Sequence, residues 1–179
     1  MGRMRIAPFE PSFAPAFKAL NEAWIRRHFT PEPKDAEILE DPAGKIIAGG
    51  GQVLFAVENG AAVGCCALIA MADGGFELAK MAVAEAAQGR GYAKALLSAA
   101  IDTARAAGAP RIYLESNVLL APALTLYRRF GFNDAPPERR IASPYARVDV
   151  WMELDLTAPR TTLDPGARRP DETDGNRQT

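Results

Sequence analysis

The chain has 179 residues, of which 48% are hydrophobic and 24% charged, with a formal net charge of −1. This balance predicts one globular domain with a sizeable core and argues against a protein that binds nucleic acid by neutralising many phosphates. The only cysteines, Cys65 and Cys66, are adjacent, which excludes a disulfide framework and a zinc cluster and favours a reduced, cytoplasmic protein. We expect no signal peptide and no membrane span, because every apolar run is too short.

The first third of the chain predicts a short strand followed by helical segments. Residues 5–10 have the pattern of a strand, and apolar residues recur at helical spacing over residues 13–29, as one or two helices. A further helical turn is expected over residues 35–39. Three consecutive glycines at 49–51 then predict a hinge or a tight turn.

A β-hairpin is the clearest element of the middle third. Two apolar runs, residues 53–57 and 61–70, are joined at Asn59-Gly60, the pair favoured in two-residue hairpin turns. A second turn at residues 73–75 leads into a strand over residues 76–83. We therefore expect three strands that meander antiparallel.

The stretch Gln88-Gly89-Arg90-Gly91-Tyr92-Ala93 follows that strand and precedes a helix predicted over residues 94–107. A glycine-rich turn at a helix start directs several backbone N–H groups toward one point, where the helix dipole adds roughly half a positive charge. Such a turn predicts a phosphate-binding loop. The chain has no P-loop motif, and Lys94 stands where a dinucleotide-binding loop needs its third glycine.

The last third predicts the remainder of a mixed sheet. The helix over residues 94–107 stops at Gly108 and leads to a strand at residues 111–115, which we expect to pair in parallel with the strand before the loop. A helix from Pro122 to about residue 130 and a strand over residues 148–156 follow. Residues 158–179 have the composition of a disordered tail.

These motifs together resemble the GNAT superfamily of acyl-CoA-dependent N-acyltransferases. The pattern Gln88-x-x-Gly91-x-Ala93 resembles its pyrophosphate signature, and Leu126-Tyr127-Arg128-Arg129-Phe130-Gly131-Phe132 resembles its Leu-Tyr-x-x-x-Gly-Phe segment, with the strands and the helix in register. The resemblance implies a single α/β (α+β) domain over residues 1–157. It also implies a mixed, mostly antiparallel central sheet flanked by helices, with strands splayed at the acyl-CoA slot.

By this resemblance the co-substrate is acetyl-CoA, and no metal is implied. The strand end would bind the pantetheine arm through its backbone, and the loop would bind the pyrophosphate. The implied cofactor-binding residues are Met81, Ala82, Val83, Gln88, Gly89, Arg90, Gly91, Tyr92, Ala93 and Lys94. For the side chains of Met81 and Val83 the alternative is ordinary strand packing, and for those of Arg90 and Lys94 it is plain solvation.

Tyr127 falls where the family carries its general acid, which protonates the departing CoA thiolate; its alternative role is packing beside Phe130 and Phe132. Glu77 is the candidate base that deprotonates the amine, with Glu115 in reserve. Glu77 and Met81 point to the same face of the strand only if no bulge lies between them. Its alternative is an exposed glutamate paired with Lys80.

Two further observations concern the acceptor and the cofactor. The only histidine, His28, and Trp24 lie in the first helical segment, which often lines the acceptor side in the family; capping and core packing are their alternatives. Leu120 stands seven residues before Tyr127, where many members have an asparagine that contacts the cofactor, and Asn117 is three residues too early to replace it.

The expected function is direct transfer of the acetyl group of acetyl-CoA to an amine, with a small molecule as the preferred acceptor and no nucleic acid or membrane as partner. The sequence leaves the acceptor's identity, the acyl-chain preference and a homodimer open. Two alternatives remain: an acyl-CoA-binding sensor or interaction module without turnover, and an interaction protein that acts through its tail.

Overall fold

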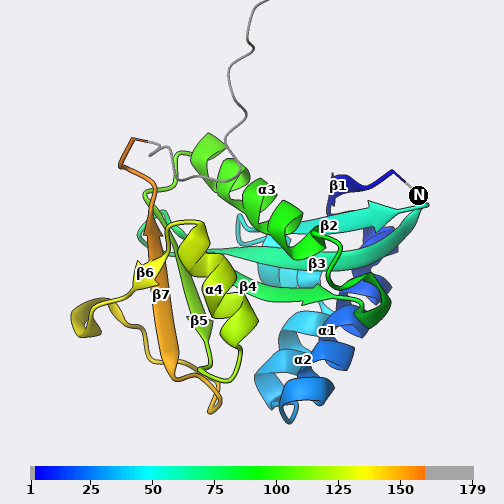
Figure 1. The fold of residues 1–179 in the computed structure, drawn as a ribbon, viewed down its shortest axis with the longest axis horizontal. Coiled ribbons are helices and arrows are strands. Elements are labelled where there is room, and N and C mark those ends of the chain that lie inside the picture. The colour runs from blue at the N-terminus through cyan, green and yellow to red at the C-terminus, as the bar shows by residue number, and fades with distance from the viewer. Residues whose placement is uncertain (1–2, 160–179) are drawn as a thin grey trace, which may run out of the picture.

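The computed structural model describes residues 3–159 of the chain (Figure 1). One strand and two α-helices precede a π-helical turn at Ala43–Ile47, and the hairpin strands follow it. In chain order the first five helices and strands are β1 (Arg5–Pro8), α1 (Ala14–His28), α2 (Pro33–Glu40), β2 (Gln52–Glu58) and β3 (Ala61–Ala70). The next six are β4 (Phe76–Val83), α3 (Tyr92–Ala106), β5 (Arg111–Ser116), α4 (Ala121–Arg129), β6 (Asn133–Asp134) and β7 (Val150–Asp155).

The strands form one sheet in the order β1-β2-β3-β4-β5-β7-β6. Every pair is antiparallel except β4 with β5, which α3 connects as a crossover, so the predicted mixed, mostly antiparallel sheet is confirmed. At the hairpin turn Asn59 and Gly60 both have positive φ, 51° and 82°, as a type I′ turn requires.

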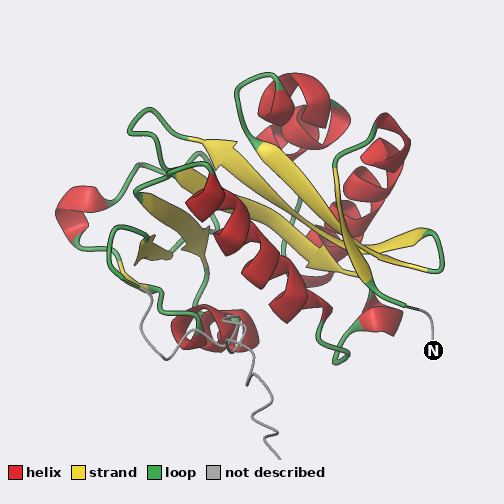
Figure 2. Ribbon diagram, turned by 90° about the horizontal axis from the view of Figure 1, so that it is seen from above, coloured by secondary structure: helices red, strands yellow, loops and turns green. Residues whose placement is uncertain are grey.

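Helices cover both faces of the sheet (Figure 2). One core cluster joins the inner side of α3, including Leu96, Leu97 and Ile101, to the strands and to Leu124 of α4. The other joins Phe17 of α1 and Leu39 of α2 to the opposite face. A three-layer domain with a core on each side of the sheet results, and each face of the slot described below therefore has its own set of helices.

Several expected boundaries were wrong by a few residues. The first strand ends at Pro8, the long helix begins at Tyr92 and ends at Ala106, and the last strand covers Val150–Asp155. The two-residue strand β6 was not predicted, because so short a strand exists only through its pairing with β7. The predicted disordered tail lies outside the described residues except for its first two, 158 and 159.

A bulge interrupts β4 at Lys80, which has a positive φ of 52°. The register with β3 shifts there, because Ala79 lies opposite Ala67 whereas Ala82 lies opposite Cys65. The extra residue reverses the side-chain alternation of the strand. Leu78 and Met81 therefore both pack on the α3 side, while Ala82 lies on the α1 side.

Among the helices of residues 3–159, none combines the length and the apolar character needed to cross a membrane.

The glycines at 49–51 give a matched test of packing at the start of β2. A Cβ on Gly51 would lie against the carbonyl oxygens of Leu68 and Ile46, well inside van der Waals contact, whereas one on Gly49 would have its nearest neighbour at 3.7 Å. We expect Gly51→Ala to lower the free energy of unfolding by about 1–3 kcal/mol, as overpacked sites do. Urea denaturation should find Gly49→Ala close to wild type; equal stability of the two variants would contradict the packing.

Candidate active site

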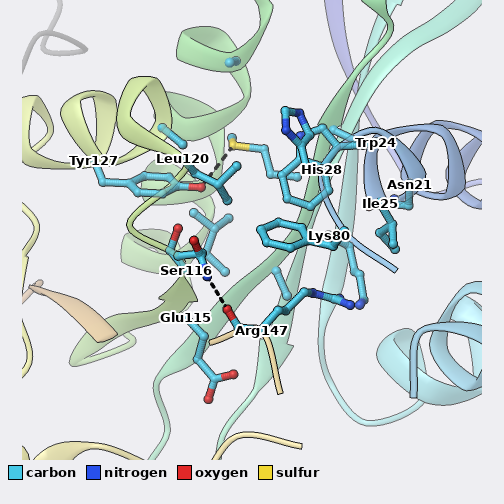
Figure 3. Close-up of a pocket in the computed structure, with 18 of the residues that line it drawn as sticks. Asn21, Trp24, Ile25, His28, Lys80, Glu115, Ser116, Leu120, Tyr127 and Arg147 are labelled. Atoms are coloured by element: carbon cyan, nitrogen blue, oxygen red, sulfur yellow. Dashed lines mark hydrogen bonds between the residues drawn. The ribbon is translucent and has the colours of Figure 1, made fainter. Parts of the chain in front are cut away.

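The parallel strands β4 and β5 are paired at one end and diverge at the other. Their pairing covers only Phe76–Leu78 with Ile112–Leu114, although β4 continues to Val83 and β5 to Ser116. The edge of β4 beyond Leu78 is therefore not bonded to β5. A cavity of about 420 Å³ lies at this divergence, lined by β4, by the end of β5 and by residues of α1, α4 and the segment 145–148 (Figure 3).

The bulge gives the cavity two chemically different sides. In Figure 3, Tyr127 and Leu120 lie on one side, and Trp24 and His28 of α1 lie on the other. Tyr127 and Met81 pack against the α3-side core. Glu77 lies opposite Ile69, which packs against the α1-side core. The cavity thus passes through the slot and reaches both faces of the sheet.

The predicted phosphate loop has the geometry of an anion site. Gly89 and Gly91 have positive φ, 73° and 84°, and Gly91 is the N-cap of α3. The first amide to donate a helical hydrogen bond is that of Ala95, to the Gly91 carbonyl at 3.0 Å. Within the described chain, the amides of Tyr92, Ala93 and Lys94 therefore have no backbone acceptor, and they lie at the positive end of the helix dipole.

The side chains of this loop have more specific roles than the sequence indicated. The Arg90 guanidinium is bound to the Glu58 carboxylate, with one N–O distance of 3.1 Å, and lies over the Tyr92 ring. The Arg90 side chain is therefore ion-paired, and plain solvation does not describe it. Gln88 donates to the Val83 carbonyl at 3.3 Å and ties the loop to the end of β4, whereas Lys94 is exposed.

Tyr127 projects from α4 into the cavity. Its hydroxyl lies 4.0 Å from the Met81 sulfur, and its ring centroid lies 5.8 Å from that of Phe132, so the tyrosine both packs and faces the slot. Burial, with a smaller contribution from Cys66, raises the pKa of Tyr127 to about 12. The hydroxyl is therefore protonated at neutral pH and can donate a proton.

Glu77 also lines the cavity, and because β4 does contain a bulge, Glu77 does not share the phase of Met81. Its alternative role was wrong, since Lys80 pairs with Asp35 and Glu77 is largely buried. Burial, and then repulsion by Glu115, raise the pKa of Glu77 to about 7. A carboxyl with this pKa is half ionised near neutral pH, as a general base there requires.

Glu115 extends from β5 on the same face as Glu77. Its carboxylate accepts a hydrogen bond of 2.6 Å from the Ser143 hydroxyl, and burial raises its pKa above the usual range. Glu115 thus remains the second carboxylate of the site, and its charge is the main electrostatic influence on Glu77.

The position of the missing asparagine is filled by an apolar side chain. Leu120 lines the cavity beside Tyr127 (Figure 3). Asn117 cannot take over the contact without losing structure, because its amide donates to the Arg147 carbonyl at 2.7 Å and its side-chain oxygen accepts from the Leu119 amide.

Sequence reasoning missed a polar group on the α1 side. Lys80, Tyr145 and Arg147 line the cavity, and Asp35 lies behind them and binds both cations. The capping box of α2, in which Asp35 is the N3 residue, was the one local signal of this group. In residues 3–159, no group of three or more His, Cys, Asp or Glu side chains is placed to hold a metal ion.

Comparison with known proteins agrees with this geometry. The sequence profile described as "Acetyltransferase (GNAT) family" matches residues 14–132. An "IAA acetyltransferase" of Azospirillum brasilense is 39% identical over 106 residues, which cover 58% of this chain and 67% of that relative.

Solved structures with the same fold are more distant in sequence. A GNAT-family acetyltransferase from Staphylococcus aureus superposes with a TM-score of 0.79 at 19% identity, over 86% of this chain and 99% of that one. A GNAT-family acetyltransferase from Brucella melitensis, solved in complex with acetyl-CoA, superposes with a TM-score of 0.66 at 23% identity, over 90% and 92% of the two chains.

The loop geometry makes a prediction about CoA binding. Gly91→Val should raise the Kd for CoA at least about tenfold, because a β-branched residue disfavours the positive φ that directs the amides toward one anion. Gly108→Val is the matched control, since Gly108 has a φ of 73° and equally open surroundings at the other end of α3. Calorimetry on both folded variants checks this; equal CoA affinities would contradict the assignment.

Proposed function

The chain belongs to the acetyltransferase (GNAT) family and acts as an acetyl-CoA-dependent acetyltransferase, and we propose that its acceptor is a small molecule with a primary amine. We further propose Tyr127 as the general acid, Glu77 as the general base, and the end of β4 with the loop 88–94 as the binding site for acetyl-CoA.

The observation that carries this proposal is the placement of an acid and a base on opposite faces of one slot. Tyr127 lies with Met81 on the α3 side, where the loop 88–94 also begins its helix. Glu77 lies on the α1 side with a pKa of about 7. An acyl group held between the diverging strands would therefore meet a proton donor on one side and a proton acceptor on the other.

Each part of the site would have its own role in the reaction. Acetyl-CoA supplies an acetyl group activated as a thioester. The amides of Tyr92, Ala93 and Lys94 hold the pyrophosphate, and the unpaired edge of β4 beyond Leu78 hydrogen-bonds the pantetheine arm. Glu77 removes a proton from the attacking amine, directly or through a water, and Tyr127 protonates the leaving thiolate.

A small acceptor is favoured by the enclosure of the α1 side. Trp24, Phe29, Tyr145 and Arg147 line this part of the cavity, whose total volume of about 420 Å³ also has to hold the acyl end of the co-substrate. That space is within the usual range for small-molecule sites.

The first kinetic prediction concerns Tyr127→Phe, which removes the hydroxyl and keeps the ring that packs on Phe132. We expect kcat with a good amine acceptor to fall about ten- to a hundred-fold, while the Kd for acetyl-CoA and the stability change little, since the hydroxyl has only the Met81 sulfur within reach at 4.0 Å. Release of free thiol measures turnover, and calorimetry measures affinity. Wild-type turnover in the variant would exclude Tyr127 as the acid; no turnover in either protein, with tight acetyl-CoA binding, would favour the sensor alternative.

The second kinetic prediction concerns Glu77→Gln. In the wild type, kcat/KM should fall as the pH drops through about 7 and Glu77 becomes protonated. The variant should lose this limb of the profile and about ten- to a thousand-fold in kcat. A profile unchanged in shape and height would show that Glu77 is not the base.

Stability measurements separate the loss of the base in Glu77→Gln from misfolding of the variant. Because the pKa of Glu77 is higher in the fold than its ordinary value of 4.5, ionisation of Glu77 destabilises the fold as the pH rises from about 4.5 to about 7. The glutamine variant should accordingly be at least as stable as wild type at pH 8 by urea denaturation. The exposed substitution Glu138→Gln is the control and should leave both rate and stability unchanged.

A further inference from the structure

The α1 side of the cavity holds two cations and two carboxylates in its lining. Lys80 and Arg147 are the cations, and Glu77 and Glu115 are the carboxylates. His28 and Tyr145 are the other titratable groups on this side. An acceptor that enters here experiences the charge that remains after these groups have paired with one another and with residues behind the lining.

Both cations bind the same carboxylate behind the lining. Asp35 is 3% exposed, and its Oδ1 accepts hydrogen bonds from Lys80 Nζ at 2.8 Å and from an Arg147 nitrogen at 2.7 Å. Its Oδ2 accepts from the other terminal nitrogen of Arg147 at 2.8 Å and from the Glu32 amide at 2.9 Å. Burial alone would raise the pKa of Asp35, but the bonds from Arg147 and Lys80 outweigh it and hold the pKa well below its usual range.

Further partners hold the two cations. The second carboxylate, Glu32, binds Arg147 at 3.2 Å, so that two carboxylates balance the two cations, and the Arg147 guanidinium lies over the Tyr145 ring, 4.5 Å from the centroid. Lys80 Nζ makes a second hydrogen bond, to the Tyr145 hydroxyl at 2.9 Å. A ligand carboxylate would therefore have to compete with Asp35 and Glu32 for these cations.

The carboxylates that face the cavity lack such partners. Among residues 3–159, Glu77 has neither a hydrogen bond nor an ion pair, and Glu115 accepts one hydrogen bond from the neutral Ser143 hydroxyl. The charge that this face presents to an acceptor is therefore negative, although two cations line it.

We propose that Asp35 is a specificity-determining residue: by pairing with both Lys80 and Arg147, whose second positive charge is balanced by Glu32, it makes the acceptor face select amines that carry no carboxylate. The inference rests on the proposed function and names the acceptor class of the same site. An ammonium group gains from Glu77 and Glu115, whereas the carboxylate of an amino acid would be repelled by both and would find Lys80 and Arg147 already paired with Asp35 and Glu32. The aromatic side chains of Trp24, Phe29 and Tyr145 suit an apolar body on the amine.

The first test uses the wild-type protein and pairs of acceptors that differ in the carboxylate. Phenylalaninol and leucinol keep the size of phenylalanine and leucine but replace the carboxylate by a neutral hydroxymethyl group. We expect kcat/KM for each alcohol, measured by thiol release, to exceed that for its amino acid about ten- to a hundred-fold. Equal values, or a preference for the amino acids, would overturn the proposal while leaving acetyl transfer to amines intact.

Binding separates failure of this inference from failure of the proposed function. With CoA bound, calorimetry should find the same preference for phenylalaninol over phenylalanine. The preference in binding without any turnover would contradict the proposed function and support the selectivity of the site. Absence of binding by both compounds would count against the site as an amine pocket and therefore against the inference.

The second test is Asp35→Asn, which keeps the shape of the side chain and removes its charge. Without the Asp35 charge, Arg147 and Lys80 carry an unbalanced positive charge and should attract a carboxylate. The ratio of kcat/KM for phenylalaninol to kcat/KM for phenylalanine should therefore fall at least about tenfold. Asp41→Asn is the matched control, because Asp41 caps the Gly44 amide on the surface near the same helix, and it should keep the wild-type preference. An unchanged preference in folded Asp35→Asn would contradict the role of Asp35; if this variant does not fold, the wild-type comparison still decides the acceptor class.

Discussion

The left-handed backbone of Lys80 is the constraint on which the site depends. A non-glycine residue with positive φ costs about 1–2 kcal/mol, and here it sits inside a central strand. The Lys80 side chain is 7% exposed and forms an ion pair with Asp35. The bulge at this residue reverses the alternation of β4, so Met81 faces the helix α3 and Glu77 faces the helix α1.

This reversal explains how one strand can serve both substrates of a transferase. Without the bulge, Glu77 and Met81 would lie on one face, and the proposed acid and base would compete for the same side of the acyl group. With the bulge, the end of β4 faces the proposed CoA side and its beginning faces the proposed acceptor side. The parallel pairing with β5 stops at Leu78, just before the bulge, so the same stretch of backbone both opens the slot and divides its faces.

The buried charges of the α1 side hold distant segments together. Asp35 joins α2 to the β4 bulge and to Arg147, which lies 112 residues further along the chain. Buried ion pairs are weak stabilisers in general, because desolvation offsets much of their attraction, but removing one partner leaves an uncompensated charge. Such a network fixes the arrangement of its parts, which here are the walls of the proposed acceptor pocket.

Local chemistry in the sequence was sufficient for the hairpin at Asn59-Gly60 and for the loop at Gly89 and Gly91, because turn geometry depends on neighbouring residues. That Tyr127 and Glu77 line the cavity could be expected from the resemblance to the family, which places the tyrosine motif and the strand before the loop at the acyl slot. The face of Glu77, the ion pair of Arg90 with Glu58 and the role of Asp35 could not. A bulge depends on register with a neighbouring strand, and these charges find partners 32 to 112 residues away, so only the tertiary structure brings them together.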